Sequence, residues 1–341
     1  MPRNAERIVF DDQRCGRCPL AARFHVLPVD RLLLEEAEMI QRSTLAACAV
    51  LAAALHTTPA VADTIYLTAG IVGSPSYVYG MAPGTGVVDS GSLITDGTYP
   101  FTGAITGLAY GHGDVYATAG AVGSASYLYG FAPESGLVDS SRLLVDDGRA
   151  FTGATTGLAY GNGELYMTAG SVGGASYLYA IDPSTGHTTS SRPIVDGDRL
   201  FTGATTGLAY GNGELYMTAG SVGSATYLYG IDPKTGDVDF ARAISAGGTL
   251  FTGAVTGLTF GNGDLYIAAG ALGSAYYLYG IDPATGRGNS ESLVTYDHTI
   301  FEGNITGLAY VTSAAAVPEP ASLALFGLGL VLVGVTRRRV R

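Results

Sequence analysis

Residues 201–220 read FTGATTGLAYGNGELYMTAG, and near-copies of this segment begin at residues 101, 151 and 251. A shorter copy, FEGNITGLAY, begins at residue 301. Residues 151–173 and 201–223 are identical, so one unit of 50 residues has been duplicated. A fixed period of this length is typical of chains built by repeating one supersecondary unit.

Each unit contains four short segments with the composition of β-strands. In the unit that begins at residue 201 these segments are residues 205–210, 214–218, 226–231 and 239–244. Gly211, Asn212 and Gly213 join the first two segments, and Asn and Gly tolerate the positive φ that a tight hairpin needs. Pro233 fixes φ in the turn between the third and the fourth. Four short antiparallel strands in each 50-residue unit predict the blade of a β-propeller.

The two ends of the repeat array complement each other. Residues 64–70 align with the second strand of a repeat, and the first strand that is missing there is found at residues 304–310. Four complete repeats and one split between the ends predict an all-β, five-bladed propeller over residues 63–312, in which the last strand closes the first blade. Such a closure leaves no long sheet edge exposed.

The chain before the repeats has the pattern of a secretory signal. Residues 39–62 begin with Met39 and the positive charge of Arg42, continue with an apolar run and end in small residues at Ala62. This pattern predicts a signal peptide that is cleaved after Ala62. Residues 1–38 precede it without any regular pattern, and we interpret them as a disordered extension or as a wrongly assigned start of the reading frame.

The end of the chain, residues 317–341, reads VPEPASLALFGLGLVLVGVTRRRVR. Pro318, Glu319 and Pro320 precede an apolar stretch, which is slightly shorter than the span of about 20 residues that crosses a bilayer. The arginines that follow favour the cytoplasmic side. This order resembles the PEP-CTERM sorting signal, and it predicts a linker and sorting tail with one hydrophobic helix over residues 313–341. A plain C-terminal anchor is the alternative.

The resemblance implies an enzyme partner and a destination. In proteins with this signal an exosortase recognises the Pro-Glu-Pro motif, so the tail lies in the membrane before processing and the body is then released or attached at the surface. Such proteins occur in Gram-negative bacteria that make exopolysaccharide. The resemblance therefore implies export to the cell envelope, surface or extracellular matrix.

Equivalent threonines are the first candidate for a ligand-facing site. The first strand of each repeat is expected to line the central channel, and each carries Thr at the same place: Thr106, Thr156, Thr206, Thr256 and Thr306. Equivalent hydroxyls could bind a sugar, although Thr in a strand is ordinarily a structural choice. The hypothesis therefore competes with a purely structural role.

The loops provide a second candidate region. The loops between strands two and three and the junctions between blades are expected on one face, and the Gly-Asn-Gly hairpins and Asp-Pro turns on the other. The first face is the better place for a ligand because its loops are longer and converge. Its acidic residues, Asp146, Asp147, Asp196 and Asp198, are interpreted as solvated loop residues in preference to a calcium site.

The third strand of each repeat carries two tyrosines, as in the YLYG of residues 127–130. Alternation places Tyr127 and Tyr129 on one face of the sheet and Leu128 on the other. Such a stripe suggests carbohydrate stacking. Because it recurs at a spacing of two in every blade, however, we expect it to belong to the core.

Several classes of function lack support in the repeats. A propeller glycosidase places carboxylates around its channel, whereas the expected inner strands read Thr-Gly-Leu-Ala-Tyr. The three cysteines precede Asp63, and the histidines after it, His112, His187 and His298, occupy unequal repeat positions. The pattern therefore predicts no catalytic triad, metal site or cofactor.

The charge of the chain argues against nucleic acid as a partner. Of 29 acidic and 18 basic residues, seven of each precede Asp63 and four arginines end the chain, which leaves 22 acidic and 7 basic residues between. Such an excess of negative charge would repel a phosphate backbone.

These features favour an exported, non-catalytic interaction or structural protein of the exopolysaccharide matrix, with carbohydrate as the candidate ligand. The alternative is an enzyme that acts on polysaccharide through a site that the sequence does not reveal. The absence of carboxylates from the expected inner strands favours the first hypothesis.

Overall fold

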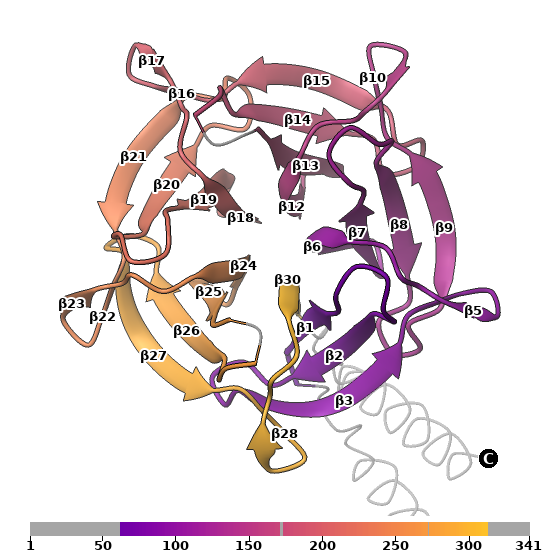
Figure 1. Ribbon diagram of the computed structural model, residues 1–341. Helices are drawn as coiled ribbons and strands as arrows, with labels where there is room; N and C mark the ends of the chain where they lie inside the picture. The colour runs from indigo at the N-terminus through magenta and orange to yellow at the C-terminus, as the bar shows by residue number, and fades with distance from the viewer. Residues whose placement is uncertain (1–61, 171–172, 272, 313–341) are drawn as a thin grey trace, which may run out of the picture. The chain divides into compact units, whose positions relative to one another are not determined.

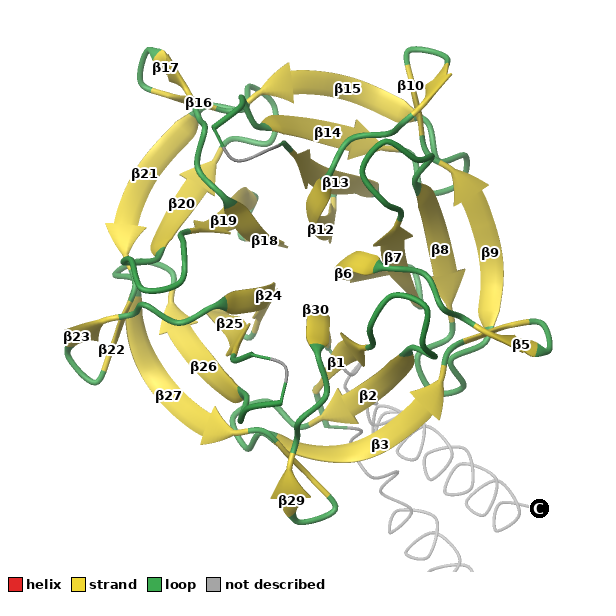
Figure 2. Cartoon of the chain, viewed as in Figure 1, coloured by secondary structure: helices red, strands yellow, loops and turns green. Residues whose placement is uncertain are grey.

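Each repeat folds into a four-stranded antiparallel sheet, and five such sheets surround a central axis (Figure 1). The computed structural model describes residues 62–170, 173–271 and 273–312. Within these ranges the regular elements are all strands, and no helix is long and apolar enough to cross a membrane (Figure 2). The predicted all-β, five-bladed propeller is therefore confirmed. The signal peptide, the residues before it, the sorting motif and the hydrophobic helix lie outside the described residues.

The blades are numbered 1 to 5 along the chain, and the strands of each blade are named from the innermost to the outermost. Blade 1 contains β30 (Ile305–Val311), β1 (Thr64–Ala69), β2 (Tyr77–Met81) and β3 (Val87–Leu93). Blade 2 contains β6 (Ile105–Gly111), β7 (Asp114–Ala119), β8 (Tyr127–Phe131) and β9 (Val138–Leu143). Blade 3 contains β12 (Thr155–Gly161), β13 (Glu164–Ala169), β14 (Tyr177–Ile181) and β15 (Thr188–Pro193). Blade 4 contains β18 (Thr205–Gly211), β19 (Glu214–Ala219), β20 (Tyr227–Ile231) and β21 (Val238–Ala243). Blade 5 contains β24 (Val255–Gly261), β25 (Asp264–Ala269), β26 (Tyr277–Asp282) and β27 (Arg287–Leu293).

The predicted hairpins have the expected backbone. Between β18 and β19 Asn212 has a φ of 54° and Gly213 a φ of 87°, which is the left-handed geometry that Asn and Gly tolerate best. His112 takes the place of Asn in blade 2 with the same φ of 54°, and its ring lies edge-on to Tyr160 with centroids 5.3 Å apart. These turns set the register that places Leu208 opposite Met217 in blade 4.

The ends of the array close the ring as predicted. β30 pairs with β1 in antiparallel register, so that Leu308 lies opposite Leu67. The hydroxyl of Tyr310 donates to Asp63 Oδ2 at 2.8 Å, and Asn262 Nδ2 donates to the same oxygen at 2.5 Å. Burial, and secondly the Asp63 carboxylate, raise the pKa of Tyr310 far above its ordinary value. Asp63 thus links the start of the first blade to the last strand and to blade 5.

The hydrophobic core lies between neighbouring blades. One cluster joins Leu178 and Ile194 of blade 3 to Leu215, Met217 and Ile231 of blade 4, and all five side chains are buried. Similar clusters occur at the other blade boundaries. Each blade therefore buries its apolar faces only with the help of its neighbours.

The inner strands fit together through a glycine in each strand. A Cβ on Gly207 would lie 2.7 Å from Cβ of Leu258 on the inner strand of the next blade. The corresponding distances for Gly107 and Gly307, to Leu158 and Leu108, are 2.8 and 2.7 Å. Because a real Cβ never approaches another atom this closely, the repeated Thr-Gly-Leu sequence fixes the spacing of the blades around the channel.

A second small hairpin follows the outer strand of every blade and was not foreseen from the sequence. The five hairpins lie at the perimeter of the ring in Figure 1. They are β4–β5 (Thr95–Asp96 and Tyr99–Pro100), β10–β11 (Val145–Asp146 and Arg149–Ala150), β16–β17 (Val195–Asp196 and Arg199–Leu200), β22–β23 (Ser245–Ala246 and Thr249–Leu250) and β28–β29 (Thr295–Tyr296 and Thr299–Ile300). The Asp147-Gly148 pair, with φ values of 48° and 74°, is a hairpin signal that the sequence did offer.

The expectation that blade junctions and Asp-Pro turns lie on opposite faces is wrong at the rim. The amide of Val145 donates to the carbonyl of Gly186 in the third turn of blade 3 at 3.1 Å, and the same bond recurs from Val195 to Gly236. Sheet twist is the physical reason. It turns the outer strands so that they run along the circumference, where the end of one meets the start of the next (Figure 1).

Candidate functional site

The five equivalent threonines, called here the ring threonines, are the bulged residues of the inner strands: Thr106, Thr156, Thr206, Thr256 and Thr306. In blade 4 Thr205 pairs with Ala219 and Gly207 with Thr218, so Thr206 has no partner in the ladder. The other four blades show the same interruption. A bulge re-aims a side chain, and here it directs each hydroxyl to the neighbouring strand. The bulge has no signal in the sequence other than the repetition of Thr-Gly.

Each ring hydroxyl makes a hydrogen bond within the protein. The five donate to a carbonyl of the second strand at 3.3–3.4 Å: Thr106 to Thr118, Thr156 to Thr168, Thr206 to Thr218, Thr256 to Ala268 and Thr306 to Thr68. Thr106 also bonds the hydroxyl of Thr155 in the next blade. A ligand in the channel would have to compete with these bonds. The threonine ring as a ligand site stays a prediction.

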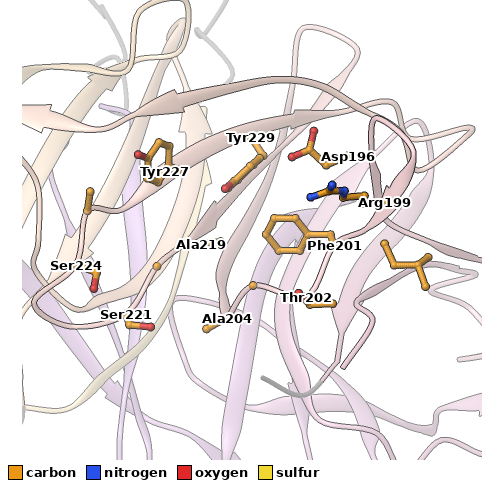
Figure 3. Close-up of a pocket in the computed structure, with 14 residues that line it drawn as sticks. Asp196, Arg199, Phe201, Thr202, Ala204, Ala219, Ser221, Ser224, Tyr227 and Tyr229 are labelled. Atoms are coloured by element: carbon orange, nitrogen blue, oxygen red, sulfur yellow. The ribbon is translucent and has the colours of Figure 1, made fainter. Parts of the chain in front are cut away.

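Two clefts occur at the rim, in equivalent places on blades 3 and 4. The cleft of blade 4 has a volume of about 460 Å³ and lies between the β16–β17 hairpin, the segment that leads into β18 and the loop between β19 and β20 (Figure 3). The cleft of blade 3 has a volume of about 610 Å³ and the corresponding walls. Both are bounded by a blade junction and a loop between strands two and three, the region that sequence favoured for a ligand.

Backbone hydrogen bonds hold the floor of the blade 4 cleft in place. The amide of Phe201 donates to the carbonyl of Ile194 at 2.9 Å, and the carbonyl of Phe201 accepts from the amide of Ser176 at 2.8 Å. A Cβ on Gly203 would lie 2.7 Å from Cζ of Phe201, so the chain can fold back under the ring only with glycine there. This contact explains why Phe-x-Gly opens every repeat.

The tyrosine stripe forms the aromatic wall of these clefts. Tyr229 meets Phe201 edge-on with ring centroids 5.0 Å apart, and the ring of Tyr227 lies 6.3 Å from that of Tyr229. In blade 3 the centroid distances from Tyr179 to Phe151 and Tyr177 are 5.1 and 6.4 Å. The two clefts therefore present the same aromatic surface.

The expectation that this stripe belongs to the core is wrong for the first tyrosine of each pair. Tyr177 and Tyr227 are 38% and 40% exposed, whereas Leu178 and Leu228 on the other face are buried. The second tyrosine is half-buried against the interblade core. The prediction that the tyrosines and the leucine lie on opposite faces of the sheet was correct. The face that carries the tyrosines is partly exposed to solvent, however, because only a short hairpin covers it.

One arginine completes each cleft, together with one carboxylate in blade 4, Asp196, and two in blade 3, Asp146 and Asp147. Asp196 and Arg199 come from the two strands of the β16–β17 hairpin and lie at the Phe201 end of the cleft (Figure 3). Burial raises the pKa of Tyr229, and the negative charge of Asp196 adds to the rise. In blade 3 burial and Asp146 have the same effect on the pKa of Tyr179. Each cleft can thus offer an aromatic face, an acceptor and a cation to one ligand.

Pairs of carboxylates lie elsewhere, across the third strand from one another. Burial, and then the neighbouring Asp139, raise the pKa of Asp114 in blade 2. Burial and Asp239 likewise raise the pKa of Glu214 in blade 4. Asp114 and Glu214 are the first residues of the second strand in their blades, whereas the clefts lie at the other end of that strand. In blade 5 the equivalent pair is neutralised, because Asn289 Nδ2 donates to Asp264 Oδ1 at 2.8 Å.

The Asp114–Asp139 pair predicts a pH-dependent stability. A carboxyl whose pKa is raised by folding binds more protons in the native than in the unfolded state, so stability falls as pH rises through that range. We expect Asp139→Asn to raise the Tm by about 1–3 °C at pH 7 and to have no effect below about pH 4. Thermal melts at both pH values measure this. Asn289→Asp should do the reverse in blade 5, and pH-independent shifts in both variants would contradict the argument.

No group of three or more His, Cys, Asp or Glu side chains among the described residues is placed to hold a metal ion. Asp147 occupies the left-handed turn of the β10–β11 hairpin, and Asp146 accepts a hydrogen bond from the Thr188 hydroxyl at 2.7 Å. The inner strands β6, β12, β18, β24 and β30 contain no carboxylate.

Comparison with known proteins identifies the tail. Residues 316–340 match the PEP-CTERM protein-sorting motif, which confirms the resemblance seen in the sequence. The motif implies export that depends on an exosortase, to the cell envelope of Gram-negative bacteria. Pro318, Glu319 and Pro320 lie within the matched residues. No curated protein matches the chain.

Solved structures with some likeness to the chain include other proteins at low identity. Glutaminyl cyclase of Myxococcus xanthus is 19% identical, with 64% of this chain and 75% of that chain covered and a TM-score of 0.41. TolB from Acinetobacter baumannii is 11% identical, with 73% and 66% covered and a TM-score of 0.42. At these values the likeness has no bearing on the function of this chain.

Proposed function

We propose that this protein is an exported, exosortase-processed protein of the cell surface or extracellular matrix whose propeller binds polysaccharide without catalysing a reaction. The observation that carries the proposal is the pair of rim clefts, which are lined by an exposed tyrosine, a buried phenylalanine ring and a carboxylate. The sorting motif supplies the location in which polysaccharide would be met.

The chemistry of the clefts suits a sugar ring. A pyranose has one face of C–H groups that can pack on an aromatic ring and hydroxyls at its edge that need hydrogen-bond partners. Tyr227 offers the first and Asp196 and Arg199 the second. An open cleft at the perimeter also suits a long polymer better than a deep pocket, because a chain can pass through it without a free end.

A purely binding role is favoured over hydrolysis by the distribution of acids. A glycosidase uses two carboxyl groups on opposite sides of one bond. The cleft of blade 4 is lined by a single carboxylate, Asp196, and the two that line the cleft of blade 3, Asp146 and Asp147, are neighbours on one hairpin. The pairs Asp114 with Asp139 and Glu214 with Asp239 are outside the clefts, and each lies across the third strand of its blade.

Affinity electrophoresis tests the proposal. Residues 63–316 contain the whole closed ring, and this protein should migrate more slowly in native gels that contain the host's exopolysaccharide or a neutral glucan. Tyr177→Ala with Tyr227→Ala should remove most of the retardation, while the matched Tyr177→Phe with Tyr227→Phe protein should keep it, because Phe retains the stacking surface. Normal melts would show that both proteins fold.

Two results would overturn the proposal. Unretarded migration of the wild-type protein in every polysaccharide, including the host's own, would leave a structural protein as the function. Release of reducing ends from a polysaccharide, lost in Glu214→Gln or Asp114→Asn protein, would establish the enzyme alternative.

A further inference from the structure

We infer that blades 3 and 4 carry two copies of one site for a neutral pyranose, and that a single polysaccharide chain occupies both. This inference rests on the proposed function. It adds the number of binding sites, the residues that select the sugar, and the absence of charge on that sugar. It starts from an asymmetry in a ring that is otherwise nearly fivefold.

The asymmetry lies in the rim hairpins. In the hairpins that lead into blades 3 and 4 the residues that face each other are Asp and Arg: Asp146 with Arg149 and Asp196 with Arg199. In the other three hairpins the corresponding pairs are Asp96 with Tyr99, Ala246 with Thr249 and Tyr296 with Thr299. Both clefts found at the rim contain an Asp–Arg pair.

The fold itself does not require these charges. The hairpin of Ala246 and Thr249 has the same strand pairing, and the edge-on contact between Phe251 and Tyr279 in the blade that follows it has a centroid distance of 5.1 Å. In blade 4 the distance from Phe201 to Tyr229 is 5.0 Å with the Asp–Arg pair present. Since the aromatic frame is the same with and without the charges, Arg149 and Arg199 are free to serve a ligand.

The Asp–Arg pair selects by hydrogen bonding. The Arg199 guanidinium is a fork of donors for ring and hydroxyl oxygens, and the Asp196 carboxylate accepts from hydroxyls on neighbouring carbons. Among the described side chains none donates a hydrogen bond to Asp196, so its acceptors are available in the cleft. Tyr229 lies between Tyr227 and the Asp–Arg pair (Figure 3), so an oligosaccharide that stacks on Tyr227 would extend past Tyr229 to bring the hydroxyls of its next unit to Asp196 and Arg199.

The charge of the protein favours a neutral sugar. The cleft of blade 4 contains one arginine and one aspartate and that of blade 3 one arginine and two aspartates, and the chain from Asp63 to the terminal arginines has 22 acidic and 7 basic residues. A polymer of uronic acids would be repelled by this field, whereas a neutral polymer would not. We therefore expect binding of neutral glucans or mannans and weak or no binding of alginate.

Two similar sites on adjacent blades give avidity. The lining residues 151–154, 169 and 170 of the blade 3 cleft are identical to residues 201–204, 219 and 220 of the blade 4 cleft, although Asp146 accepts a hydrogen bond from Thr188 and Asp196 does not have this partner. When both clefts hold one polymer, the second binding event is intramolecular. The apparent affinity then exceeds that of one site by about 100-fold or more. A short oligosaccharide cannot bridge the clefts and would show the single-site affinity.

Affinity electrophoresis with laminarin, galactomannan and alginate in parallel gels tests the inference. We expect Arg199→Ala alone to raise the apparent Kd for the best neutral polymer by about tenfold or more. Arg149→Ala with Arg199→Ala should abolish retardation. Lys234→Ala removes the same charge from an exposed turn outside the clefts and should leave the Kd unchanged.

The outcomes separate this inference from the proposed function. If the double arginine variant binds as well as the wild type while the double Tyr→Ala variant does not, the proposed function stands and the Asp–Arg sites are wrong. Preferential retardation by alginate would overturn the neutral class, and an affinity for polymer equal to that for a hexasaccharide would overturn joint occupancy. A wild-type protein that binds nothing would defeat the proposed function and this inference together.

Discussion

Gly207→Ala should lower the stability of the propeller by about 3 kcal/mol, which corresponds to a fall of about 6–12 °C in Tm. The added Cβ would lie 2.7 Å from Cβ of Leu258 and 3.1 Å from its backbone nitrogen. Neither atom can move by rotation of a side chain, so the inner strands of blades 4 and 5 must separate. Circular dichroism melts of the wild-type and variant proteins measure the effect.

Gly288→Val is the matched control. This glycine is also in a strand with ordinary φ, but its nearest neighbour would be the Ser245 carbonyl oxygen at 3.1 Å. The other blades carry Val or Thr at the same place: Val88, Val138, Thr188 and Val238. The control should therefore melt at or above the wild-type temperature. Equal destabilisation by both substitutions would show that the cost is a general one of replacing strand glycines.

Removal of the last strand should abolish the folded state. A chain that ends at Gly303 lacks β30, which pairs with β1 and contributes the buried side chains of Ile305, Leu308 and Tyr310 to the core. The loss leaves the edge of β1 unpaired and removes the inner contacts of blades 2 and 5. Since the whole stability of a domain is about 5–15 kcal/mol, we expect no cooperative transition and a tendency to aggregate.

A chain that ends at Thr312 is the control for this deletion. It keeps the complete strand, including the bond from Tyr310 to Asp63, and should melt cooperatively at the temperature of the longer protein. A cooperative melt of the chain that ends at Gly303 would mean that four blades are stable as an open ring, and that closure by β30 contributes little.

The rim shows where reasoning from the sequence stopped. The alternation in YLYG correctly separated Tyr227 from Leu228, but it did not tell which side of the sheet meets another blade. That depends on the twist and on the hairpin after the outer strand, which is formed by residues interpreted as loops. The Asp147-Gly148 signal could have revealed one of these hairpins.

The threonine ring shows the same limit for the candidate site. The sequence placed Thr206 on an inner strand, which is correct, yet the bulge turns its hydroxyl to the carbonyl of Thr218. A bulge depends on the pairing of two strands, and the order of residues along one strand does not encode it.

The sequence by itself determined the number of blades, the order of their strands, the closure by the last strand and the sorting tail. These properties follow from local rules, because period, turn residues and motif order act within one repeat or one segment. The two clefts and the exposure of their tyrosines depended on the tertiary structure. They arise where neighbouring blades meet, and the angle at which twisted sheets pack is a property of the whole ring that no single repeat contains.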